Sequence, residues 1–152
     1  MATEKEKQQY VDEMVRRRGY VLEYHKVMAE HDYDVLMAAD GLVEAAYLKQ
    51  RRLDRRTKEL LFILSLTVLG ASTAHIQSHI RVALDLGLTP GEILEAIEIA
   101  LPEAGVVAFQ RGLDAWCEVV GATGIEPATV LSAADTDGPH ASVPSQNNSV
   151  MA

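Results

Sequence analysis

The chain has 152 residues, 48% hydrophobic and 24% charged, a balance typical of one globular domain with a sizeable core. Its formal net charge of −8 at pH 7 disfavours attraction to nucleic acid or to anionic membranes, so neither is expected as a partner. The longest apolar run, residues 60–71, is too short to cross a bilayer, and the polar first ten residues do not resemble a signal peptide. We therefore expect a cytoplasmic protein. Its single cysteine, Cys117, excludes an internal disulfide.

The first part of the chain predicts two helical stretches. Residues 1–9 are charged and are expected to fray. Apolar side chains then recur at helical spacing from Tyr10 to about Glu30, with a break near Gly19, and again from about Tyr33 to Lys49. Several basic or imidazole side chains have no evident partner and are interpreted as surface groups: Arg16, Arg17, Arg18, His25 and His31.

The clearest helix start in the sequence is Asp54, whose carboxylate can cap a helix that begins near Arg55. Residues 60–69 of this helix are apolar on nearly every side, which is typical of a helix at the centre of a bundle or in a subunit interface. Gly70 is expected to end it with a positive φ. The length of the segment and its charged first turn favour a helix over a buried strand.

The next predicted helix begins at a cap, Ser72 or Thr73, and is closed by Gly87. It contains His75 and His79, and their four-residue spacing places both imidazoles on one face with Cβ atoms about 5–6 Å apart. Such a pair can bind one divalent ion, transfer protons, or form an inert polar patch.

Two more helices are predicted before the composition changes. In the segment TPGEI, Thr89 and Glu92 form a capping box and Pro90 takes the first helical position. This helix is expected to stop near Pro102, and the last helix covers roughly residues 103–120.

We expect residues 1–121 to form a single all-helical domain. Residues 122–152 are rich in Ala, Ser, Thr, Gly and Pro and have few large apolar side chains. A segment of this composition cannot build its own core, so we interpret it as a low-complexity C-terminal arm or tail.

A metal site on the two histidines needs a further ligand, and the candidate carboxylates are Glu59 and Glu103. One hypothesis is a single divalent ion (Zn, Fe, Mn or similar) bound by His75, His79 and Glu59. The other has no metal: an imidazole transfers a proton while the carboxylate orients it. The residues leave both open. Arg55, in the basic cluster of residues 49–56, is a candidate for binding an anionic substrate.

Roughly residues 51–110 resemble the carboxymuconolactone decarboxylase family, which includes the alkylhydroperoxidase D branch. In chain order, the matching segments are Leu53–Arg56 with the apolar helix that follows, His79–Leu84, Gly87–Thr89, Glu92–Ile93 and Ala104–Val106. The resemblance implies an all-α helical bundle with a family-like core at about residues 51–120, and a homo-oligomer, commonly a trimer or hexamer.

The peroxidase branch of this family carries the motif Cys-x-x-Cys-x-x-x-His, and a glutamate on the preceding helix joins its proton relay. In this chain His79 matches the motif histidine, His75 takes the place of the second cysteine, and Ser72 takes the place of the first. Glu59 lies where the relay glutamate belongs. Disulfide-based peroxide reduction needs a thiolate nucleophile, so we do not expect a thiol peroxidase.

The chain is more similar to the decarboxylase branch, which lacks the cysteines and keeps a histidine at the position of His79. This similarity implies a lyase-like enzyme that acts on a small carboxylated or oxygenated metabolite by decarboxylation, isomerisation or lactone chemistry. The expected catalytic residues are His79, His75 and Glu59, and Arg55 and Glu103 are expected to bind substrate. The alternative is a non-catalytic helical oligomer that binds a small acid or serves as an assembly partner.

Overall fold

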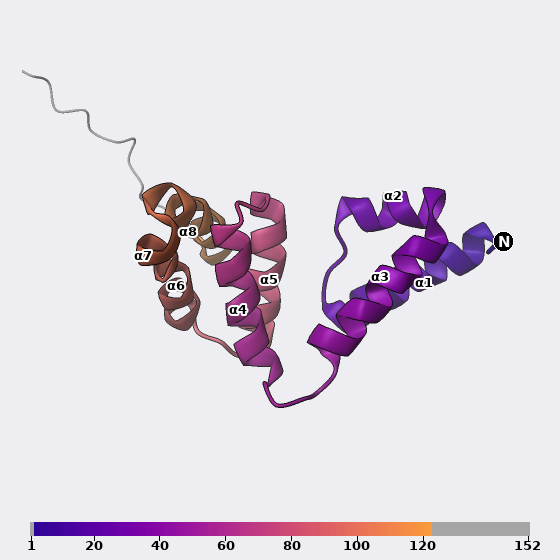
Figure 1. Ribbon diagram of the computed structural model, residues 1–152, viewed down its shortest axis with the longest axis horizontal. Coiled ribbons are helices and arrows are strands. Elements are labelled where there is room, and N and C mark those ends of the chain that lie inside the picture. The colour runs from indigo at the N-terminus through magenta and orange to yellow at the C-terminus, as the bar shows by residue number, and fades with distance from the viewer. Residues whose placement is uncertain (1, 123–152) are drawn as a thin grey trace, which may run out of the picture.

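The computed structural model describes residues 2–122, in which helices are connected by short loops (Figure 1). In chain order the helices are α1 (Glu4–Arg18), α2 (Glu23–His31), α3 (Tyr33–Val43), the π-helical turn η1 (Glu44–Leu48), α4 (Arg55–Val68), α5 (Thr73–Asp85), α6 (Pro90–Glu98), α7 (Ala100–Ala104) and α8 (Val106–Val120). These residues contain no β-strand, which confirms the all-α class. The predicted C-terminal arm, apart from Ala122, lies outside the described residues.

The helices form two groups, α1–α3 and α4–α8, joined by the loop that follows η1 (Figure 1). The core of the second group is built mainly from isoleucines of α4, α5 and α6, with Ala115 of α8 against them. A smaller apolar cluster holds the first group together and consists of Val11, Met14, Ala29 and Leu36. Each group therefore has its own apolar core.

Helix α4 lies at the centre of its group, as its apolar sequence predicts, because it packs against α5, α6, α7 and α8. Ile63 is completely buried, whereas Leu61, Phe62 and Leu69 remain exposed along one strip of the same helix. Helix α8 approaches α4 closely at Gly112, where an added Cβ would lie 2.7 Å from the Thr67 side chain and 2.8 Å from that of Ile97.

The predicted caps are confirmed. Asp54 accepts a hydrogen bond from the Thr57 amide at 2.7 Å, and Ser72 accepts one from the His75 amide at 3.3 Å. Thr89 and Glu92 form the capping box, with Pro90 in the first turn of α6. Local side-chain chemistry therefore fixes where α4, α5 and α6 begin.

Two predicted boundaries are wrong. The N-terminal residues do not fray: α1 begins at Glu4, because Thr3 and Glu6 form a capping box. The helix expected to stop near Pro102 ends earlier, at Glu98, and Pro102 lies inside the short α7. Proline is tolerated there because backbone N–H groups in the first turn of a helix have no intrahelical partner.

The arginines at the end of α1 do not all face solvent, which corrects the sequence interpretation. Arg18 is 3% exposed and its guanidinium is paired with the buried Asp40 of α3. Asp40 also accepts hydrogen bonds from Arg17 and from the Tyr10 hydroxyl, each at 2.7 Å. Burial by itself would raise the pKa of Asp40, but hydrogen bonds from Arg17, Tyr10 and Arg18 outweigh it and lower this pKa to about 2.

The sequence interpretation of His25 as a surface group is also wrong, because this side chain is 1% exposed. His31 is exposed, as expected. The Nε2 atom of His25 lies 3.1 Å from a guanidinium nitrogen of Arg18, which can only donate, so this nitrogen accepts. Burial, followed by the positive charge of Arg18, lowers the pKa of His25. A neutral imidazole therefore completes the buried polar cluster of α1, α2 and α3.

The described residues include no helix that is long and apolar enough to span a membrane. This finding agrees with the shortness of the apolar run in the sequence.

We predict that Gly112→Ala destabilises the protein by about 1–3 kcal/mol, because the new methyl group would overlap the Thr67 and Ile97 side chains. Urea unfolding followed by circular dichroism measures the change. The matched control is Gly41→Ala in α3, where no atom lies within 4 Å of the added Cβ and the better helix former is expected to be neutral or stabilising. Equal stability of the two variants would contradict the close packing of α8 on α4.

The second prediction concerns pH. Because the pKa of His25 is lower in the folded state, the unfolded chain binds the extra proton, and stability falls as the pH drops below about 6.5. His25→Gln keeps an acceptor for Arg18 but cannot titrate, so the loss of unfolding free energy between about pH 7.5 and about pH 5.5 is expected to shrink. His31→Gln, at an exposed site, is expected to keep the original slope. A slope left unchanged by His25→Gln would count against this assignment.

Candidate functional site

The candidate site is built on the antiparallel hairpin of α4 and α5. Glu59 precedes Gly70 by 11 residues and His79 follows it by 9, so the two side chains are at nearly the same height along the paired helices. Gly70 (φ +70°) ends α4, and the Ser72 cap begins α5. The turn chemistry thus sets the register that brings the carboxylate to the imidazole.

Glu59 and His79 are both completely buried, and they form the centre of the site. The Nδ1 atom of His79 lies 2.8 Å from Oε2 of Glu59. An ionised carboxylate only accepts hydrogen bonds, so Nδ1 carries a proton, and in the neutral ring Nε2 keeps the lone pair. This is the arrangement in which a carboxylate orients an imidazole for proton transfer.

Two further side chains donate to Glu59. The Nε atom of Arg55 lies 2.7 Å from Oε1, and the Tyr47 hydroxyl donates to the same oxygen. Burial alone would raise the pKa of Glu59, but hydrogen bonds from His79, Tyr47 and Arg55 outweigh it and lower this pKa. The carboxylate is therefore ionised at neutral pH, although it is sealed from water.

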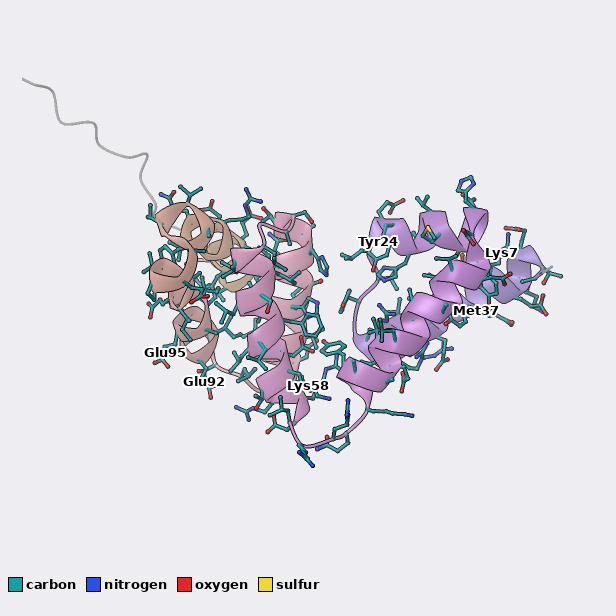
Figure 2. All side chains as sticks on the ribbon, viewed as in Figure 1. Lys7, Tyr24, Met37, Lys58, Glu92 and Glu95 are labelled. Carbon is teal, nitrogen blue, oxygen red and sulfur yellow. The ribbon has the colours of Figure 1, made fainter. Side chains whose placement is uncertain are left out.

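Tyr47 comes from the π-helical turn η1, and contacts with α4 hold it in place. The buried Lys58 ammonium donates to the backbone carbonyls of Tyr47 at 3.0 Å and of Lys49 at 2.8 Å, which ties the end of η1 to α4. Figure 2 shows Lys58 on α4 beside the loop that connects the two helix groups. Arg55 donates to the Tyr47 hydroxyl at 2.9 Å and lies 4.1 Å above its ring.

Aromatic rings enclose the imidazole of His79. The Phe62 ring stacks on it almost in parallel, with centroids 4.8 Å apart and an interplanar angle of 2°. On its Nε2 side the Tyr20 hydroxyl lies 3.1 Å away. Tyr20 belongs to the turn between α1 and α2, so the first helix group supplies one wall of the site.

His75 lies beside the central pair and is half-buried, with its ring centroid 5.5 Å from that of His79 and 6.4 Å from that of Tyr20. Burial and the neighbouring His79 lower the pKa of His75. At neutral pH this imidazole is uncharged, and it provides a polar group at the more exposed edge of the site.

The predicted metal ligands are not arranged as a ligand set. Glu59 is occupied by hydrogen bonds from His79, Tyr47 and Arg55, and Nδ1 of His79 faces Glu59 rather than a shared ion position. Among residues 2–122, no three His, Cys, Asp or Glu side chains are grouped closely enough to bind a metal ion. The donor geometry therefore fits a hydrogen-bonded acid–base site better than a three-ligand metal site.

The two predicted substrate-binding residues lie in different places. Arg55 is at the site, but its guanidinium already donates hydrogen bonds to Glu59, Tyr47 and the carbonyl of Arg18. Glu103 is exposed on the short α7 and is not part of the group around His79.

Two hollows lie near η1 and the start of α4, and Ala46 and Lys58 line both. One, of about 200 Å³, is apolar and includes Leu61 and Phe62 in its wall. The other, of about 540 Å³, is lined by the exposed Arg51 and Arg52.

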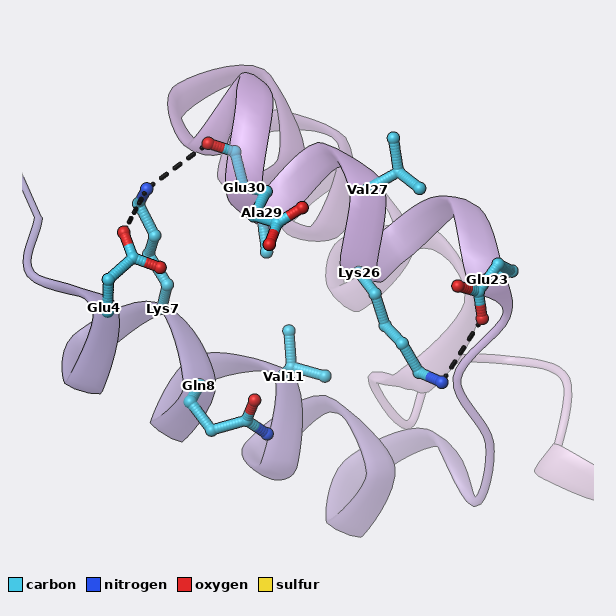
Figure 3. A pocket seen from close by; sticks show the side chains of 9 residues that line it. All are labelled: Glu4, Lys7, Gln8, Val11, Glu23, Lys26, Val27, Ala29 and Glu30. Atoms are coloured by element: carbon cyan, nitrogen blue, oxygen red, sulfur yellow. Dashed lines mark hydrogen bonds and ion pairs between the residues drawn. The ribbon is translucent and has the colours of Figure 1, made fainter.

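Another hollow, of about 490 Å³, lies between α1 and α2, away from His79 (Figure 3). Charged side chains at its rim pair with each other: Lys7 with Glu4, and Lys26 with Glu23. Apart from these pairs, Glu30 is the charged side chain in its lining, so the hollow offers little that would single out a ligand.

A comparison with protein-family models matches residues 34–118 to the carboxymuconolactone decarboxylase family, 85 of the 152 positions. The chain belongs to the carboxymuconolactone decarboxylase family. The family assignment predicted from the sequence is thereby confirmed, together with its all-helical fold. A comparison with curated proteins gives no significant match. The matched segment contains Tyr47, Arg55, Glu59 and His79, whereas Tyr20 lies outside it.

Sequence reasoning missed the site's aromatic residues, Tyr20, Tyr47 and Phe62. Phe62 was visible as the residue one turn after Glu59 in α4, on a face directed at the site. The two tyrosines give no such signal, because they reach His79 from 59 and 32 residues away in the chain.

We predict that Arg55→Lys lowers the unfolding free energy by about 1–3 kcal/mol, because a lysine cannot donate to Glu59, Tyr47 and the Arg18 carbonyl at once. The neighbouring Arg56→Lys, with its guanidinium half-exposed near Glu92, is the control and is expected to stay within about 0.5 kcal/mol. Urea unfolding of both variants measures the difference. If Arg55 served only to bind substrate, the two variants would be equally stable.

Proposed function

We propose that this protein is an enzyme that acts on a small carboxylated or oxygenated metabolite by acid–base chemistry at His79. The reaction class is decarboxylation, isomerisation or lactone chemistry. The observation that supports this proposal is the completely buried Glu59–His79 pair, with Nδ1 and Oε2 2.8 Å apart. A charged carboxylate is costly to bury, and one that orients a histidine is a common device for proton transfer.

In this proposal Nε2 of His79 takes up the proton that the substrate loses, or supplies the proton that it gains. The imidazolium formed in the first case is stabilised by Glu59, which stays ionised because Arg55 and Tyr47 also donate to it. Phe62 excludes water from one face of the ring. The low dielectric strengthens the attraction between the imidazolium and the carboxylate at the moment when positive charge develops.

The hollow of about 540 Å³ beside Ala46 and Lys58 is the candidate site for the acidic part of the substrate. Arg51 and Arg52 line it, and through Ala46 and Lys58 it adjoins the apolar hollow on Tyr47 and Phe62. A ligand with an apolar body and one carboxylate would fit this combination. We assign Arg55 to the support of Glu59 rather than to the substrate, and we assign no role to Glu103.

The proposal is metal-free, and it is supported by the hydrogen bonds that Glu59 makes with His79, Tyr47 and Arg55. A thiol peroxidase is not expected, because Ser72 and His75 stand at the positions of the family's two cysteines. A homo-oligomer in the cytoplasm belongs to the same proposal. The homo-oligomer is supported by the large apolar side chains of Leu69 and Val107, which are 80% and 74% exposed.

The test is turnover of a panel of carboxylated lactones and β-keto acids, followed by ultraviolet absorbance and by release of carbon dioxide. We expect His79→Gln to lower kcat by about 10²–10⁴-fold, because general acid–base catalysis supplies a factor of that size. His31→Gln, at an exposed position, is the matched control and is expected to keep full activity. Circular dichroism shows whether each variant is folded.

Activity that survives in folded His79→Gln would overturn the assignment of the base. Elemental analysis of protein purified without a histidine tag separates the metal-free from the metal-dependent version. The metal-free version requires activity to survive a chelator. A protein that binds small carboxylates but turns over none of the panel would instead support the non-catalytic alternative.

A further inference from the structure

The nitrogen of His79 that exchanges protons faces a tyrosine. Nδ1 donates to Glu59, so Nε2 holds the lone pair, and the Tyr20 oxygen lies 3.1 Å from it. A phenol is the donor in a bond to an unprotonated imidazole nitrogen. The three groups therefore form one chain in which Tyr20 donates to His79 and His79 donates to Glu59.

The backbone that carries Tyr20 is held in place by both α4 and α5. Arg55 donates to the carbonyl of Arg18 at 3.1 Å. Gly19 has φ +89°, and an added Cβ would lie 2.9 Å from Cγ2 of Val82. A left-handed conformation and this close approach both require glycine. The hydroxyl of Tyr20 is thus positioned by the segment before it rather than by the tyrosine side chain alone.

Burial raises the pKa of Tyr20 to about 12, and the negative charge of Glu59 contributes to the increase. The phenol is therefore protonated at neutral pH, as a donor to Nε2 must be. Tyr20 is also only half-buried, and its ring is 6.4 Å from that of the half-buried His75. Tyr20 and His75 are thus two half-buried polar side chains beside the completely buried His79.

We propose that Tyr20 is the residue that exchanges the proton with the substrate, and that His79 acts through it. This inference rests on the proposed acid–base function and names a second proton-transferring group for it. Nothing in the family match points to Tyr20, which lies outside residues 34–118.

The proton balance is simple. When the substrate loses a proton from carbon or oxygen, that proton forms a new O–H bond on Tyr20 as the original hydroxyl proton moves to Nε2. The substrate keeps the electron pair, and His79 becomes an imidazolium beside the Glu59 carboxylate. In the reverse direction Nε2 returns its proton to Tyr20 as Tyr20 protonates the substrate. Because the two transfers are coupled, a free phenolate need not form.

The direct test compares Tyr20→Phe with the unmodified full-length chain by ¹⁵N nuclear magnetic resonance of the histidine rings. Phenylalanine keeps the ring that shields His79 and removes only the hydroxyl. In the unmodified protein we expect His79 to be protonated on Nδ1, with Nε2 shifted as a hydrogen-bonded acceptor. In Tyr20→Phe the Nε2 resonance is expected to move toward the chemical shift of an unprotonated nitrogen that accepts no hydrogen bond. Tyr24 lies at the start of α2 and is 54% exposed, so Tyr24→Phe is expected to leave the Nε2 resonance unchanged.

The kinetic test uses any substrate that the unmodified protein turns over. We expect Tyr20→Phe to lower kcat by at least about tenfold while KM changes by less than about threefold, because the hydroxyl acts in the transition state. Tyr24→Phe is expected to keep both constants. A purely structural role for Tyr20 would instead lower stability and leave the Nε2 resonance and the kcat of the folded fraction unchanged.

Three results would overturn this inference: a His79 protonated on Nε2, an Nε2 resonance that does not respond to Tyr20→Phe, or full kcat in that variant. If His79→Gln abolishes turnover and Tyr20→Phe does not, the proposed function stands and this inference fails. If the unmodified protein turns over no substrate, the proposed function fails, and the resonance experiment still decides whether Tyr20 donates to His79.

Discussion

The buried carboxylate of Glu59 is the constraint on which the arrangement of this molecule depends. A fully buried charge costs several kcal/mol unless donors compensate for it. The donors here come from η1, from the first turn of α4 and from α5: Tyr47, Arg55 and His79. The carboxylate is stable only when these segments are in place. Because Arg55 also donates to the carbonyl of Arg18, the same network connects the two groups of helices, whose apolar cores are separate.

The fold contains a second buried carboxylate, Asp40, and the contrast shows why only one of the two suits catalysis. Each accepts from a tyrosine and an arginine. The remaining partner differs: Asp40 has the guanidinium of Arg18, which cannot lose its proton, whereas Glu59 has an imidazole, which can both donate and accept one. The cluster around Asp40 therefore ties α1 to α3 as a fixed charge pair, while the cluster around Glu59 contains a group suited to proton transfer.

How far the sequence predicts this protein depends on the distance between interacting residues. Caps depend on neighbours three residues away, so Asp54, Ser72 and Thr89 were predictable from composition and spacing alone. Glu59 and His79 were candidates from residue type and spacing, the resemblance to the family supported them, and the length of the hairpin explains why they meet. Arg18 and His25 look like surface groups until Asp40, 22 residues after Arg18, is placed beside them. Tyr20 gave no local signal, because its partner lies 59 residues later.

The site is thus assembled from two sources. The family-matched segment supplies the carboxylate, the imidazole and the donors that keep Glu59 ionised, and under the proposed function these groups transfer protons without choosing a substrate. The turn before α2, outside that segment, supplies the hydroxyl that faces Nε2. In the proposed mechanism the substrate exchanges its proton with Tyr20. A change in the turn that carries Tyr20 would therefore alter which proton is exchanged while the Glu59–His79 pair stays intact. One helical scaffold can then serve different reactions when the segment next to its imidazole varies.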